Sequence, residues 1–62
     1  MYKVMYKVYE IVIKVERHSS ERTIALTCDE TSLNEIFNFI YDLNEVFTSV
    51  EIIDINITNK EL

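Results

Sequence analysis

The chain has 62 residues, and its six Lys or Arg and eleven Asp or Glu side chains leave a formal net charge of -5. One Cys excludes an internal disulfide framework, the absence of Gly excludes a glycine-rich phosphate loop, and the net charge argues against a basic nucleic-acid surface. A domain this small buries only about 60% of its unfolded surface, so without disulfides it needs a metal, a second copy or an unusually apolar core.

Self-association is the expected source of additional stability. One Cys and one His give no metal-ligand cluster, so we expect neither a metal nor a cofactor. The apolar content of 48% is high for a single domain, residues 1–62, that also carries 27% charged residues, and this predicts a homodimer. No apolar run is long enough for a membrane span or a signal peptide, and the free thiol suits a reducing compartment, so the sequence predicts a cytoplasmic protein.

Residues 2–15 are predicted to form one long strand, because apolar residues alternate along them. The alternation changes phase, from even to odd positions: Tyr2, Val4, Tyr6 and Val8, then Ile11, Ile13 and Val15. A one-residue slip moves every side chain to the opposite face. Either a bulge near 8–10 restores one buried face, or the two halves bury opposite faces against different partners.

A hairpin is predicted to follow, with a polar turn over 17–22 and a second strand over 23–28. We expect a four-residue loop from His18 to Glu21 with a type I turn, because a two-residue loop requires positive φ angles. This register pairs apolar residues on one face: Val15 with Ile24, Ile13 with Leu26, and Ile11 with Cys28.

Residues 32–47 are predicted to form a helix that begins with a capping box, in which Ser32 and Glu35 each satisfy a free backbone N–H group. Residues at helical spacing form a predicted core stripe: Leu33, Ile36, Phe37, Ile40, Leu43 and Phe47. Phe39 and Val46 flank this stripe.

Residues 50–58 are predicted to form a third strand, and residues 59–62 are expected to fray. In that strand Ile53, Ile55 and Ile57 share one face, with Val50 and Ile52 on the other. The expected fold is α+β, β-β-α-β, with a three-stranded antiparallel sheet in the order 2-1-3 and one helix on one face.

One helix cannot cover a strand as long as the first, so the N-terminal half of that strand is expected to pack against a second copy. The predicted dimer interface combines that half with the flanks of the helix: Tyr2, Val4, Tyr6, Val8, Phe39 and Val46.

No arrangement of residues predicts an enzyme or a catalytic site. His18 lies beside Ser19, but adjacent residues in one polar turn do not converge as a catalytic triad requires, so His18 is interpreted as an exposed turn residue. Cys28 is interpreted as a small core residue.

Glu35, Asp42 and Glu45 are the main functional indication, because they line one exposed side of the predicted helix. They serve either as a solubilising face or as an acidic surface that docks onto a basic protein. The resulting hypothesis is a small acidic interaction module, a homodimeric inhibitor or adaptor of a basic partner such as a nucleic-acid-binding protein. Residues with AT-rich codons are abundant, which is typical of an AT-rich genome such as that of a phage or mobile element.

The alternative hypothesis is direct binding of single-stranded nucleic acid. Aromatic and basic residues interleave in the N-terminal strand, and such clusters bind single strands by stacking: Tyr2, Lys3, Tyr6, Lys7 and Tyr9. The net charge of the chain argues against this alternative.

Overall fold

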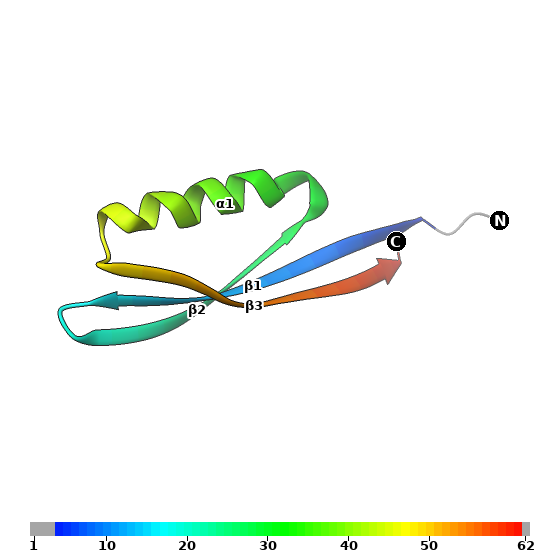
Figure 1. Ribbon diagram of the computed structural model, residues 1–62. Coiled ribbons are helices and arrows are strands. Elements are labelled where there is room, and N and C mark those ends of the chain that lie inside the picture. Colours follow the sequence, from blue (N-terminus) through cyan, green and yellow to red (C-terminus); the bar gives the residue numbers. More distant parts are fainter. Residues whose placement is uncertain (1–3, 62) are drawn as a thin grey trace.

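The computed structural model describes residues 4–61 and consists of a three-stranded antiparallel sheet with one helix on one face (Figure 1). Its elements are β1 (Met5–Arg17), β2 (Ser20–Asp29), a 3-10 helical turn (Glu30–Ser32), α1 (Leu33–Asp42), a second 3-10 turn (Leu43–Glu45) and β3 (Ser49–Glu61). The spatial order is β2-β1-β3. The predicted α+β class, strand order and helix placement are confirmed.

The core lies between α1 and the middle of the sheet. Ile11, Ile13 and Val15 alternate along β1 and are at most 1% exposed, and Ile40 of α1 packs on them. Partly buried side chains surround these four: Ile24, Leu26, Leu33, Ile36, Leu43, Phe47 and Val50. The predicted helix stripe is therefore correct except for Phe37, which is 39% exposed.

The hairpin between β1 and β2 is tighter than predicted. His18 and Ser19 alone connect the strands, with φ angles of 52° and 66°. Two positive φ angles in a two-residue loop are the geometry of a type I′ turn, whose twist matches that of the strands. The predicted four-residue loop was therefore wrong.

The tighter turn also changes the strand register by two residues. Ile13 pairs with Ile24 and Ile11 pairs with Leu26, so the predicted cross-strand pairs were wrong. A shift of two residues keeps every side chain on its face. For this reason the predicted buried face of the hairpin is correct although its pairs are not.

Of the two alternatives for β1, the bulge near residues 8–10 is absent, and the apolar residues of its two halves lie on opposite faces; the bulge of the sheet lies in β3 instead. β1 pairs without interruption with β2, and its register with β3 shifts between Val12 and Ile13. These two residues pair with Asp54 and Ile52, which leaves Ile53 as the extra residue.

This bulge brings the two apolar sets of β3 to one face. Val50 pairs with Val15, and Ile55 pairs with Ile11, so both lie on the side of the sheet that α1 covers. The prediction that Val50 and Ile52 face away from Ile55 was therefore wrong.

The chain enters α1 through the 3-10 turn, and this changes the cap. Ser32 has φ -98° and ψ 2° and makes no side-chain cap, so the predicted capping box with Glu35 was wrong. Asp29, in extended conformation, caps the turn instead. Its carboxylate accepts hydrogen bonds from the Thr31 hydroxyl at 2.7 Å and from the Ser32 backbone N–H at 3.0 Å.

The far end of the sheet is a two-stranded ribbon that extends beyond β2 and α1 (Figure 1). β3 continues to Glu61, which pairs with Met5, so the expected fraying of residues 59–61 was wrong. β2 ends at Asp29, opposite Val8. We call residues 5–8 and 58–61 the distal ribbon, and the part of the sheet around Ile11, Ile13 and Val15 the covered end.

Candidate interaction surface

Two open hollows, each of about 400 Å³, lie among residues 4–61. The first lies where β2 ends beside the distal ribbon, and it is lined by Met5, Tyr6, Lys7, Asp29, Glu30 and Thr31. The second lies at the hairpin end, and it is lined by Val15, Arg17, His18, Ser20, Arg22, Ile24 and Phe47. His18 and Ser20 both line the second hollow, but within residues 4–61 neither side chain forms a hydrogen bond, so they are not arranged as base and nucleophile.

The ionisable groups near these hollows are dispersed. Across residues 4–61, no three His, Cys, Asp or Glu side chains gather closely enough to hold a metal ion. His18 is an exposed turn residue, as predicted, and Cys28 is half-buried opposite Tyr9. The hydrogen bond from the Thr31 hydroxyl, followed by that from the Ser32 N–H, lowers the pKa of the Asp29 carboxyl below its usual value of 3.8.

No helix in residues 4–61 has the length and apolar character required to cross a membrane.

The three predicted partner-binding carboxylates are all exposed. Glu35 and Asp42 lie on α1, and Glu45 lies in the 3-10 turn that follows it. Within residues 4–61, none of them forms an ion pair. Their charges are therefore available to a partner, because no neighbouring cation neutralises them.

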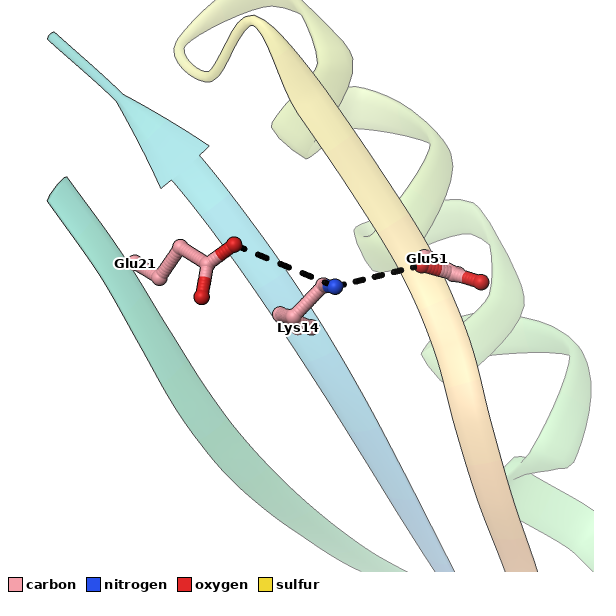
Figure 2. A network of polar contacts seen from close by, with 3 residues as sticks. All are labelled: Lys14, Glu21 and Glu51. Carbon is pink, nitrogen blue, oxygen red and sulfur yellow. Dashed lines mark ion pairs between the residues drawn. The ribbon is translucent and has the colours of Figure 1, made fainter. Parts of the chain in front are cut away.

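A second acidic surface, which sequence reasoning missed, lies on the face of the sheet away from α1. Lys14 of the central strand reaches Glu21 of β2 at 3.9 Å and Glu51 of β3 at 3.7 Å (Figure 2). Asn56 donates hydrogen bonds to Glu10 at 3.4 Å and to Asp54 at 3.2 Å. The exposed ion pairs contribute little stability, about 0–1 kcal/mol each, and leave the face acidic.

The residues of the predicted dimer interface lie on two different parts of the molecule. Val4, Tyr6, Phe39 and Val46 are exposed and Val8 is half-buried, while Tyr2 lies outside the described residues. Tyr6 and Val8 share the face of β1 that points away from the core residues, whereas Phe39 and Val46 belong to the helix layer. The structure therefore does not bring the two groups together.

The largest exposed apolar set that the prediction missed is on β3. Ile52, Ile53, Ile55 and Ile57 are 41–57% exposed. Their alternation predicted which of these side chains share a face, and not which of them the helix covers. The signal against burial was length, because a ten-residue helix spans about 15 Å whereas a strand of 13 residues spans about 43 Å.

The aromatic and basic residues of β1 do not form one binding face. Successive side chains of a strand point to opposite faces, so Tyr6 lies on one face and Lys7 and Tyr9 lie on the other. Tyr2 and Lys3 lie outside the described residues. This arrangement gives no support to stacking of successive bases on interleaved aromatic side chains.

Comparison with known proteins gives no relative from which a function can be transferred. The sequence matches no protein-family model, and no characterised protein or solved structure is significantly similar to it. The charges and exposed apolar residues of the surface are therefore the basis for inferring what the chain binds.

Proposed function

We propose that the chain is a small acidic protein–protein interaction module that acts as a homodimer and binds a basic partner as an inhibitor or adaptor. The observation that supports this most is the set of exposed carboxylates on the helix segment, Glu35, Asp42 and Glu45, which have no cation beside them in residues 4–61. Carboxylates of this kind accelerate association with a basic surface and make it sensitive to salt.

The location and source of the module form part of the proposal. The free thiol of Cys28 suits a reducing compartment, so we place the module in the cytoplasm. A basic nucleic-acid-binding protein is the preferred partner, because an acidic module competes with nucleic acid for such a surface. The abundance of residues with AT-rich codons agrees with a phage or mobile-element source.

The test compares two neutralised variants that carry the same net charge. The helix variant is E35Q/D42N/E45Q, and the matched control E10Q/E21Q/E51Q removes three carboxylates from the opposite face of the sheet. Each immobilised protein captures proteins from a bacterial lysate, and mass spectrometry quantifies them across a salt series.

The proposal predicts that basic proteins captured by the unmodified chain are lost with the helix variant and retained with the control. Their capture should also decline steeply as salt is raised. Equal retention by both variants, or equal loss from both, would contradict it. Equal loss would mean that net charge alone drives capture.

A further inference from the structure

The molecule exposes more surface than a compact monomer of its mass. A folded monomer of 7.4 kDa exposes about 4,200 Å², whereas this chain exposes 5060 Å². Its radius of gyration is 14.3 Å, compared with about 10.6 Å for a compact domain of this length. The excess of roughly 850 Å² is close to the ~800 Å² that each partner buries in a standard protein–protein interface.

The outer edge of β3 is the part of the sheet best suited to this burial. β3 is an edge strand with β1 on one side, and no described strand pairs with its other side. Soluble proteins protect such edges with proline, bulges or inward-pointing charges. Here the bulge is at Ile53, so residues 54–61 continue as a regular strand without proline, and its charged residues Asp54 and Lys60 protect it against pairing unless a partner neutralises them.

Opposite charges on this edge are placed symmetrically about Ile57, the most exposed isoleucine of the strand. Asp54 and Lys60 each lie three residues from Ile57, and both face away from α1, since they pair with Val12 and Tyr6. Neither forms an ion pair within the described part of the chain. An antiparallel copy of the strand centred on Ile57 places each Asp54 opposite the Lys60 of the second copy.

We infer that two copies of this chain join edge to edge through residues 54–60 of β3, antiparallel about a two-fold axis at Ile57. The product is a six-stranded sheet in the order β2-β1-β3-β3-β1-β2, with both helices on the same face. If the axis lay at Ile55, Asp54 would face Asn56 of the second copy, and if it lay at Asn56, Asp54 would face Thr58. Neither residue carries a positive charge that neutralises the carboxylate of Asp54.

The same arrangement explains why the distal ribbon lacks a helix of its own. A two-stranded ribbon is marginally stable by itself. Pairing through β3 makes the two ribbons the centre of a four-stranded sheet, and it places one helix at each end of that centre. The Ile57 side chains then meet on the helix-bearing face, where they are withdrawn from water.

This inference rests on the proposed homodimer and is independent of the proposed basic partner. Its first test is a charge swap at two exposed positions, with D54K, K60D and the double variant D54K/K60D. Each single variant places two like-charged pairs at the interface, so the dimer dissociation constant should rise by about tenfold or more. The double variant restores both opposite pairs and should return to within a few-fold of the unmodified chain.

Two features make the swap specific to the interface. D54K reduces the net negative charge, so long-range repulsion alone would strengthen association rather than weaken it. Within one copy the two side chains lie six residues apart on a strand, about 20 Å, so they cannot rescue each other internally. Light scattering over a dilution series gives the dissociation constant, and circular dichroism verifies that each variant is folded. Unchanged single variants, or a double variant that does not recover, would overturn the inference.

The second test fixes the register with single cysteines in a C28A background. I57C places two thiols at the axis and should form a covalent dimer on mild oxidation. The matched control I55C lies on the same face, but its two thiols are offset by four residues, about 13 Å, which is too far for a disulfide. Cross-linking of I55C would overturn this interface, and so would a dimeric unmodified chain in which neither variant cross-links; in both cases the homodimer would form through another surface.

A monomeric unmodified chain would overturn both the β3 interface and the homodimer. The helix variants would still test the basic partner.

Discussion

The two ends of β1 belong to one continuous strand but have opposite environments. At the covered end, Ile11 and Ile13 are fully buried beneath α1. In the distal ribbon, Met5 is 54% exposed and Tyr6 is 39% exposed, although the backbone pairing with β3 continues as far as Met5. Backbone pairing therefore extends the sheet further than side-chain packing can cover it.

The reach of the helix decides which isoleucines are buried. Ile13 and Ile57 are the same residue type on adjacent strands, yet Ile13 is fully buried, whereas Ile57, which pairs with Tyr9 next to the distal ribbon, is 57% exposed. A short helix shields only one end of a long sheet. The remaining apolar surface is left for another chain to cover.

The largest expected effect compares truncation of an isoleucine buried under α1 with truncation of the half-exposed isoleucine at the bulge of β3. Ile13→Ala creates a cavity under α1 and should lower the free energy of unfolding by about 2–5 kcal/mol, which approaches the total stability of a domain this small. Ile53→Ala removes a half-exposed side chain and should cost about 1 kcal/mol or less. Urea titration followed by circular dichroism measures both. Equal losses would show that the two environments do not differ as described.

A smaller effect is expected at the turn that closes the covered end. His18 and Ser19 both have positive φ angles, which cost a residue with a Cβ atom about 1–2 kcal/mol. The replacement H18N/S19G supplies the residues preferred in a type I′ turn, so it should raise the free energy of unfolding by about 1 kcal/mol. A rise in Tm of about 4–8 °C is the expected result for a domain this small. Ser20→Gly, just inside β2, is the control and should lower Tm; a decrease with the turn variant would contradict the turn geometry.

The smallest effect concerns Asp29, which lies where β2 ends and the distal ribbon begins. Its pKa is lowered by hydrogen bonds to Thr31 and Ser32, so the ionised carboxylate stabilises the fold above about pH 3.8. That contribution is lost as the pH falls through the lower pKa of the folded state. Asp29→Asn should lower Tm by a few degrees at neutral pH, and the difference should vanish in strong acid. Asp42→Asn, at a carboxylate without a hydrogen-bond donor in residues 4–61, is the control, and an equal loss there would contradict the role of the cap.

Much of the fold was predictable because it follows from periodicity. The spacing of Leu33, Ile36 and Ile40 indicated the helix and its buried stripe, and the alternation of Ile11, Ile13 and Val15 indicated the buried strand face. The positive φ angles at His18 were not predictable, because the twist of the paired strands overrides the local preference of the turn residues. The bulge was visible in part, since the apolar residues of β3 change phase between Ile52 and Ile53.

The candidate surface was predicted less completely than the fold. The exposure of Glu35, Asp42 and Glu45 followed from the polar side of a helical pattern. The exposed isoleucines of β3 were missed, because alternation shows which side chains share a face and not whether anything covers that face. The distance that a helix reaches along a sheet is a property of the tertiary structure.

Sedimentation equilibrium of the unmodified chain at micromolar concentration tests the central claim most directly. If a second copy covers the β3 edge, the measured mass is twice 7.4 kDa and falls toward a single chain on dilution. A constant mass of 7.4 kDa, together with a folded circular dichroism spectrum and cooperative thermal unfolding, would contradict it.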